Sequence, residues 1–139
     1  MHETPVRGIG ALVRARKCVL KRGSLRTLAA LAALKTEFGQ IGPFVPRASD
    51  GERKFRIAEI VPLLRSNPGA DDELLRRIEG FVEKDSRGEV RYNVTILLQG
   101  SEYIVKDGNK RTIAFYERRR ESMTHLIEFP VFVVQFAQT

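Results

Sequence analysis

The chain has 139 residues and a formal net charge of +7, from 24 Lys and Arg against 17 Asp and Glu, with a single cysteine. This length suits one domain with a hydrophobic core, and one cysteine excludes an internal disulfide, which fits a reducing, cytoplasmic setting. No apolar run approaches the roughly 18 residues of a membrane span, so we expect no membrane partner. The two histidines lie far apart without a cysteine cluster, so we expect no metal site.

The positive charge is concentrated in the N-terminal third of the chain. Residues 1–50 hold nine Lys and Arg against three Asp and Glu, whereas residues 51–139 hold fifteen against fourteen. Such a basic block suits the phosphate backbone of nucleic acid, and a solvated charged surface explains it equally well. The candidate nucleic-acid-binding residues are Arg14, Arg16, Lys17, Lys21, Arg22 and Arg26.

The first predicted element is a helix. Residues 11–22 fit neither a helical nor a strand period. Ser24 is a suitable N-cap for a helix from Leu25 to about Phe38, and Gly39 would end it. Its broad apolar face favours a packing helix over the recognition helix of a helix-turn-helix, which needs exposed polar side chains.

A linker follows, because residues 39–54 are rich in Gly, Pro and Ser. We therefore divide the chain into two parts. Residues 1–50 form a basic N-terminal arm with one helix, over about 25–38, and the linker. Residues 51–139 form a small domain that combines helices and a mixed sheet, of the α+β or α/β class.

The second part begins with a predicted strand over residues 55–61, which alternate loosely between apolar and polar and are closed by Pro62. Acidic residues 71–73 then complement the start of a helix dipole, and apolar residues at three- and four-residue steps predict a helix that ends before Ser86. Residues 94–98 and 103–105 are rich in β-formers, and Gly100 and Ser101 between them predict a hairpin with a two-residue turn.

The last two elements are a helix to about Ser122 and a strand over residues 127–134. This strand is apolar on both faces, which predicts a place in the middle of the sheet. A strand, a helix and another strand in sequence imply a right-handed crossover, so we expect the last strand to run parallel to residues 103–105. The turn before the helix would then lie at the carboxyl end of the sheet, where open α/β folds bind ligands.

That turn is the part of the sequence with the clearest functional signal. The stretch around this turn, residues 102–117, has the sequence EYIVKDGNKRTIAFYE. A predicted strand is followed there by a glycine turn and then by a helix that begins with two cations. Free backbone N–H groups and the positive end of a helix dipole favour a phosphate at such a point. The candidate phosphate-binding residues are Gly108, Asn109, Lys110, Arg111 and Thr112.

Some of these residues also have ordinary structural explanations. Gly108 could simply take a positive φ angle while Asn109 caps the helix, and the Thr112 hydroxyl could bond to a phosphate or back to a helix carbonyl. Glu59 and Asp107 are the acids we nominate for general-base or metal-assisting work, although each also suits a structural role. The Arg118, Arg119 and Arg120 side chains fan out at about 100° per residue, which favours a solvated helix face.

The order of elements in residues 55–136, together with the motif Asp-Gly-x-x-Arg-x-x-Ala, resembles the N-terminal domain of the ParB and sulfiredoxin superfamily. Asp107, Gly108, Arg111 and Ala114 match that motif. The resemblance implies a ParB/sulfiredoxin-like fold whose turn holds the phosphates of a nucleoside triphosphate, CTP or ATP, with Mg²⁺. It also implies a nucleotide-dependent, DNA-associated switch or an enzyme that transfers phosphate or hydrolyses a phosphoester or nucleotide.

The chain departs from the superfamily in ways that limit this inference. Sulfiredoxins have a reactive cysteine where this chain has Asn109, so reductase activity does not carry over. Lys110 stands where many members have His or Arg, and a lysine binds phosphate as a point charge. The candidate partners are a nucleotide, DNA and a second copy of the chain.

Two other functions remain as alternatives. The first is a non-catalytic nucleic-acid-binding module that uses the basic N-terminal arm. The second is a degenerate Fic or Doc-like protein, because the letters DGNKRT also occur in the Fic motif. Tyr103 stands at the catalytic histidine position of that motif and Val105 at its phenylalanine position, and the Fic loop lies between helices, whereas here we expect a hairpin before it.

Overall fold

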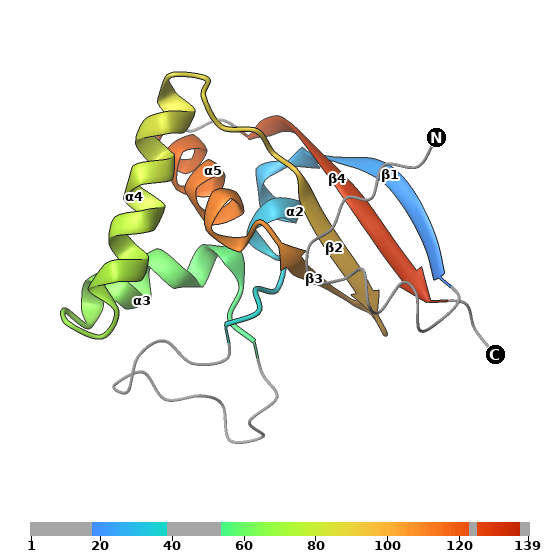
Figure 1. Ribbon diagram of the computed structural model, residues 1–139, viewed down its shortest axis with the longest axis horizontal. Coiled ribbons are helices and arrows are strands. Elements are labelled where there is room, and N and C mark those ends of the chain that lie inside the picture. Colours follow the sequence, from blue (N-terminus) through green and yellow to red (C-terminus); the bar gives the residue numbers. More distant parts are fainter. Residues whose placement is uncertain (1–17, 39–53, 123–124, 137–139) are drawn as a thin grey trace.

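A computed structural model describes residues 18–38, 54–122 and 125–136 (Figure 1). Four strands, four helices and one 3-10 turn follow one another along these residues. In chain order they are β1 (Cys18–Thr27), α2 (Leu28–Ala32), the 3-10 turn η1 (Ile57–Glu59), α3 (Ile60–Ser66), α4 (Asp72–Ser86), β2 (Val94–Gln99), β3 (Glu102–Asp107), α5 (Asn109–Glu121) and β4 (Leu126–Phe136). The expected small mixed sheet with flanking helices is therefore confirmed. No helix in the described part of the chain is long and apolar enough to cross a membrane.

The sheet has the strand order β1-β4-β2-β3, so the apolar strand β4 lies inside it, as its sequence predicts. β4 pairs antiparallel with β1 and parallel with β2, and β2 pairs antiparallel with β3. The expectation that the last strand runs parallel to residues 103–105 is wrong, because β4 joins β2 and runs opposite to β3. The edge of β3 that faces away from β2 is hydrogen-bonded to Lys35. Lys35 N–H donates to Tyr103 O at 2.9 Å, and Val105 N–H donates to Lys35 O at 2.8 Å.

With this topology, the glycine turn lies at a different edge of the sheet from the one expected. Gly108 follows the carboxyl end of β3, but it lies beside Val94, at the amino end of β2. The parallel strands β2 and β4 begin at this edge, so the turn does not lie at the carboxyl ends of parallel strands as expected. Its ligand-binding potential therefore rests on its own amides and side chains.

The predicted helix over residues 25–38 is mostly wrong. β1 extends to Thr27, and only Leu28–Ala32 is helical, with Thr27 Oγ1 accepting from Ala30 N at 3.1 Å. Ser24, the predicted N-cap, lies in β1 opposite Pro130. Pairing with β4 outweighs the helix propensity of this stretch, and it also orders residues 18–22, whose own pattern had no clear period.

The predicted strand over residues 55–61 is also wrong. These residues contain a single bridge at Arg56, opposite Lys35, and then η1 and the start of α3. The buried residues are Ile57, Ile60, Val61 and Leu64, at the three- and four-residue steps of a helix. Pro62 lies in the first turn of α3, where its missing N–H has no helical acceptor to lose.

The later elements agree with their predictions. Asp71 caps α4 by accepting from Leu74 N at 3.1 Å, and acids occupy the first turn of that helix. β2 and β3 form a hairpin in which Gln99 pairs with Glu102, and Gly100 has a φ of 63° in the two-residue loop. α5 begins directly after Gly108, and α4 and α5 lie on the same side of the sheet (Figure 1).

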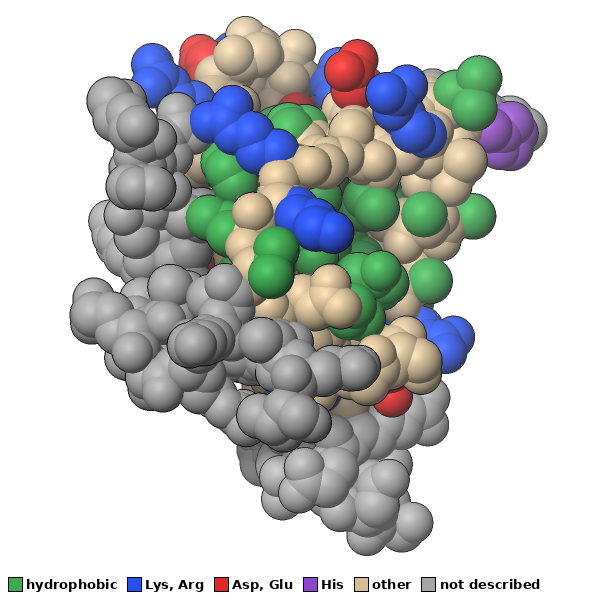
Figure 2. Space-filling model, turned by 90° about the vertical axis from the view of Figure 1, so that its right-hand side faces the viewer, with side chains coloured by type: hydrophobic (Ala, Val, Ile, Leu, Met, Phe, Trp, Pro, Cys, Tyr) green, Lys and Arg blue, Asp and Glu red, His purple; other side chains and the backbone are tan. Residues whose placement is uncertain are grey.

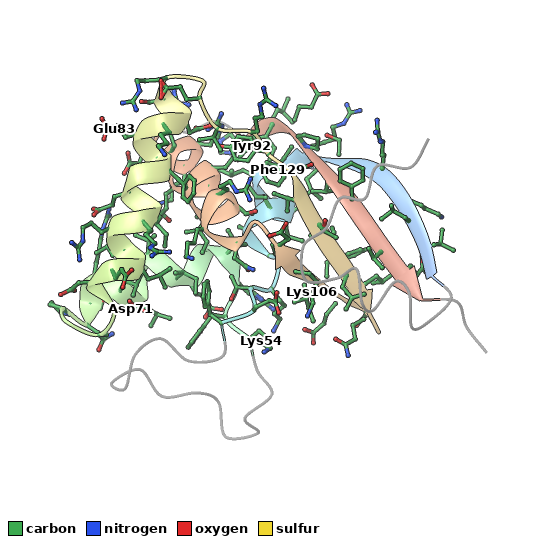
Figure 3. The ribbon with its side chains drawn as sticks, in the orientation of Figure 1. Lys54, Asp71, Glu83, Tyr92, Lys106 and Phe129 are labelled. Carbon is green, nitrogen blue, oxygen red and sulfur yellow. The ribbon has the colours of Figure 1, made fainter. Side chains whose placement is uncertain are left out.

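The core lies between the sheet and the helices. Phe115 of α5 meets Phe129 of β4 with ring centroids 4.7 Å apart, and Tyr92 packs against both at 5.1 and 5.3 Å. Figure 3 shows Tyr92 and Phe129 near one another at the start of β4. Leu31 and Leu34 join the same buried cluster. Residues 18–38, assigned by sequence to a separate arm, therefore share the sheet and the core of the later residues.

Candidate functional site

The turn between β3 and α5 has a backbone conformation that requires glycine. Gly108 has φ 90° and ψ 24°, the left-handed region that L side chains rarely adopt. A Cβ atom built there would lie 2.9 Å from Val94 Cγ2, so the close approach to β2 also disfavours a side chain. The positive φ expected for Gly108 is confirmed, whereas the cap is Gly108 itself and Asn109 is the first helical residue.

Two side chains of the predicted phosphate site hold the turn together. Asn109 Nδ2 donates to Val105 O at 3.1 Å, and its Oδ1 accepts from Glu37 N at 3.2 Å. Thr112 Oγ1 donates to Gly108 O at 2.7 Å, and Thr112 is 0% exposed. The Thr112 hydroxyl therefore bonds back to the helix start, and this residue does not line the groove described next.

The turn forms one wall of a groove of about 630 Å³. Residues 106–111 line it on the side of β3 and α5, so Gly108, Asn109, Lys110 and Arg111 of the predicted site all contribute. The facing wall comes from α4, through Arg77, Gly80, Phe81 and Lys84. These four positions follow steps of three and four residues and so share one face of the helix. Phe38 completes the lining.

The groove is strongly basic. Five of the residues that line it are cations, namely Arg77, Lys84, Lys106, Lys110 and Arg111. Asp107 is the only carboxylate among the described lining residues. The N-terminus of the 13-residue helix α5 adds its first-turn N–H groups and its dipole at the same place. Charge, dipole and backbone donors therefore all favour an anion here.

Several of these cations already have partners. Lys106 Nζ lies 3.1 Å from Glu37 Oε2, and Figure 3 shows Lys106 on β3. Arg77 Nη2 lies 2.8 Å from Glu73 Oε1, one turn earlier on α4. Arg111 Nη1 donates to Arg91 O at 3.1 Å, which uses one of its five N–H donors. All three contacts involve exposed or partly exposed side chains, so each contributes little free energy.

The two nominated acids lie in different settings. Asp107 ends β3 and lines the groove. Glu59 lies in η1, not on a strand as expected, and its Oε1 accepts from Arg56 N at 2.8 Å, which stabilises the start of that turn. Glu59 does not line the groove. The structure therefore brings Asp107 to the candidate phosphate-binding residues and leaves Glu59 elsewhere.

The predicted nucleic-acid-binding residues divide into two groups. Lys21, Arg22 and Arg26 lie on β1 and are exposed, and the Arg22 guanidinium lies 5.4 Å from the centroid of the Phe132 ring. Figure 2, which views the molecule from the right-hand side of Figure 1, shows Lys and Arg side chains interspersed with apolar ones on that face. Arg14, Arg16 and Lys17 lie outside the described residues.

A second charged cluster, which the sequence analysis did not identify, surrounds Asp85 at the end of α4. Its carboxylate accepts from Arg118 Nη1 at 2.9 Å, from Arg119 and from the Tyr92 hydroxyl. The Arg119 guanidinium also lies 3.7 Å from the Phe115 ring centroid. The expected solvated face is therefore wrong for Arg118 and Arg119, because these long neighbouring side chains both reach one carboxylate. Arg120 instead pairs with Glu117 at 3.0 Å.

The cluster changes the titration of its members. Burial alone would raise the pKa of the Asp85 carboxyl, but hydrogen bonds from Tyr92, Arg118 and Arg119 outweigh burial and lower the pKa below its ordinary value of 3.8. Burial and the bond to Asp85 raise the pKa of the Tyr92 hydroxyl. Asp85 is thus charged at neutral pH and ties α4 to α5, which is a structural role. A hint was present in the sequence, since an acid in the last turn of a helix opposes the helix dipole.

The remaining contributors to the groove were also missed. No sequence motif marks Phe38, Arg77, Phe81 or Lys84, and only the packing of α4 beside α5 brings them to the turn.

Among the described residues, no group of three or more His, Cys, Asp and Glu side chains could hold a metal ion. Comparisons with protein-family models, curated proteins and solved structures gave no match to this chain.

Proposed function

We propose that the chain binds a nucleotide through its phosphates, in the groove between α4 and the start of α5. The observation that carries this proposal is the meeting of the α5 N-terminus with five Lys and Arg side chains in one groove. A phosphate chain offers several negative oxygens, and it matches both the backbone N–H groups and the cations. The volume of about 630 Å³ is in the range of sites for molecules of nucleotide size.

The resemblance to the ParB and sulfiredoxin superfamily supports the same proposal. The residues of its motif follow a hairpin strand and open a helix, which is the setting in which a glycine turn presents its amides to a phosphate. A Fic-like function is disfavoured, because a β-hairpin precedes the loop and β4 follows α5.

Within this proposal, the activity is that of a nucleotide-dependent switch, or of an enzyme that hydrolyses or transfers a phosphate. Asp107 lines the groove, and we infer that it acts beside bound phosphates, either on a water molecule or on a Mg²⁺ ion that arrives with a nucleoside triphosphate. A reductase of the sulfiredoxin type is not proposed, since Asn109 has no thiol and its amide is used to bridge Glu37 and Val105.

The direct test is calorimetric titration of CTP, ATP and ADP, with Mg²⁺, into the wild type and into Lys110→Ala and Arg111→Ala variants. We expect binding by the wild type and a loss of about 10- to 100-fold in each variant, the effect of removing one charge-assisted contact to a phosphate. Arg76→Ala is the matched control, because Arg76 is exposed on α4 and does not line the groove. Failure of the wild type to bind any of the three nucleotides would overturn the proposal.

The exposed cations of β1 support a second function, the binding of nucleic acid. Because β1 is part of the sheet, removing it would disturb the fold, and point substitutions are the better probe. We expect the triple substitution of Lys21, Arg22 and Arg26 to Gln to weaken DNA binding and to flatten its dependence on salt concentration, because fewer counterions are released. Unchanged binding and salt dependence, measured by fluorescence anisotropy, would reject this function.

A further inference from the structure

Gly80 is a glycine that the fold does not require. It lies in the interior of the 15-residue helix α4, where glycine is less favourable than alanine because it loses more backbone entropy on folding. Its φ is not positive, and a Cβ atom built at this position would meet nothing within 4 Å. Gly108 differs on both counts, with its positive φ and its contact to Val94. Neither backbone conformation nor packing therefore explains Gly80.

The place of Gly80 in the groove offers an explanation. It lies in the wall formed by α4, one turn after Arg77 and one turn before Lys84, and it faces the groove that residues 106–111 close on the other side. A Cβ atom at this position meets no protein atom within 4 Å, so a larger side chain has free space at this wall of the groove. The absence of a side chain thus widens the groove in the middle of one wall.

Two aromatic rings line the same groove as Gly80. Phe81 follows Gly80 directly, and Phe38 lines the same groove. The Lys84 amine lies 5.8 Å from the centroid of the Phe81 ring, so a cation and a ring stand together beside the glycine. A flat, partly apolar group with polar edges suits such a surface, because rings and cations both stack favourably on aromatic bases.

We propose that Gly80 makes room for the base of the nucleotide, with the phosphates at the Gly108 turn, so that this position on α4 limits the size of the ligand that the groove accepts. This inference rests on the proposed nucleotide-binding function. It assigns the two ends of the ligand to different walls: the anionic end to the start of α5, and the planar end to Gly80 and the two phenylalanines.

The test adds side chains at position 80 and compares two probes. Gly80→Leu and Gly80→Gln fill the groove with an apolar and a polar side chain, and Gly80→Ala adds only a Cβ atom. Glu79→Leu is the control, because Glu79 is exposed on the same helix and does not line the groove. Thermal denaturation of each variant is measured first, and we expect no position 80 variant to melt below the wild type, because Leu, Gln and Ala all favour a helix more than Gly does.

Calorimetry then uses CTP and ATP as one class of probe and inorganic tripolyphosphate, which has no base, as the other. For Gly80→Leu and Gly80→Gln we expect the affinity for the nucleotides to fall by about 10-fold or more, and the affinity for tripolyphosphate to change by less than about 3-fold. Gly80→Ala should lie between these variants and the wild type, and Glu79→Leu should resemble the wild type.

Each other outcome identifies which idea fails. If the wild type binds nucleotides and both larger variants bind them equally well, the role of Gly80 is overturned while the proposed function stands. If both variants lose tripolyphosphate to the same extent as nucleotides, the base is not at Gly80. If the wild type binds neither class of probe, the proposed function fails and this inference fails with it.

Discussion

Gly108 allows the turn to lie against β2 while its backbone enters α5. We predict that Gly108→Ala lowers the free energy of unfolding by about 2–4 kcal/mol, from the cost of a positive φ in alanine and from the overlap with Val94. The measurement is urea denaturation. Gly88→Ala separates the two causes, because Gly88 has φ 68° but nothing within 4 Å of its Cβ position. Equal losses in the two variants would show that the contact with Val94 contributes nothing.

The residues of the site differ in how well the sequence revealed them. The motif was sufficient to locate Gly108, Lys110 and Arg111, because the order of strand, glycine and cationic helix start is local in the chain. It could not distinguish whether the Thr112 hydroxyl turns to a ligand or to Gly108 O, since both fit the same spacing. No local sequence pattern marks the groove residues of α4, because only the packing of α4 against α5 brings them to the turn.

At the scale of single elements, the long helix and the hairpin were predictable and the short segments were not. α4 has 15 residues, with a capping aspartate and a repeated apolar period, so local and tertiary preferences agree. In residues 55–61 the same apolar residues fit two periods. Ile57 and Val61 satisfy both an alternating strand and a helix, and the burial of Ile60 and Leu64 shows that the helical period applies.

The Asp85 cluster joins α4, α5 and the connecting segment that holds Tyr92, and its removal is predicted to loosen them together. Asp85→Asn keeps the side-chain volume but removes the charge that faces Arg118 and Arg119, so we expect a loss of about 2–3 kcal/mol in the free energy of unfolding at pH 7. Chemical denaturation measures this loss. Glu83→Gln, which breaks an exposed pair with Arg87, is the control and should have little effect.

The same variant makes a prediction about pH. Because the folded pKa of Asp85 is lowered, its contribution to stability is fully present above the unfolded value, which we take as its ordinary value of 3.8, and is lost as the pH falls through the folded pKa. The difference in stability between the wild type and Asp85→Asn should therefore be constant near neutral pH and should shrink below about pH 3.8. A difference that stays constant down to pH 2 would contradict the assignment.

At the scale of the whole molecule, the pairing of β1 with β4 was not predictable from the sequence. Residues 18–27 lie about a hundred positions before their partners, and no local pattern indicates a pairing over such a separation. The direction of β4 was missed for a similar reason, since β4 pairs with β2 and not with β3, the strand that precedes it in the chain. Fold class depended on local signals and was predicted, whereas strand order depended on distant contacts and was only partly predicted.

This pairing leads to a prediction about truncation. We expect a chain of residues 51–139 to lack the cooperative thermal transition of the full chain, because it loses a strand beside β4 and the buried side chains of Leu31 and Leu34. Circular dichroism during heating provides the measurement. Leu31→Ala in the full chain, which removes one of these core side chains, should cost about 2–4 kcal/mol and keep a single transition. A truncated chain that melts like the full one would show that residues 18–38 add nothing to the core.

The antiparallel register that places Cys18 opposite Phe136 also has a consequence for biosynthesis. On the ribosome, residues 18–27 emerge long before their β4 partners are translated, so this strand stays unpaired while the roughly hundred intervening residues are made. Meanwhile the hairpin of β2 and β3 can close soon after it emerges, because its two strands are adjacent in the chain. The sheet is therefore completed only after β4 has emerged, and exposed cations on a strand that waits for its partner are of the kind that oppose aggregation at strand edges.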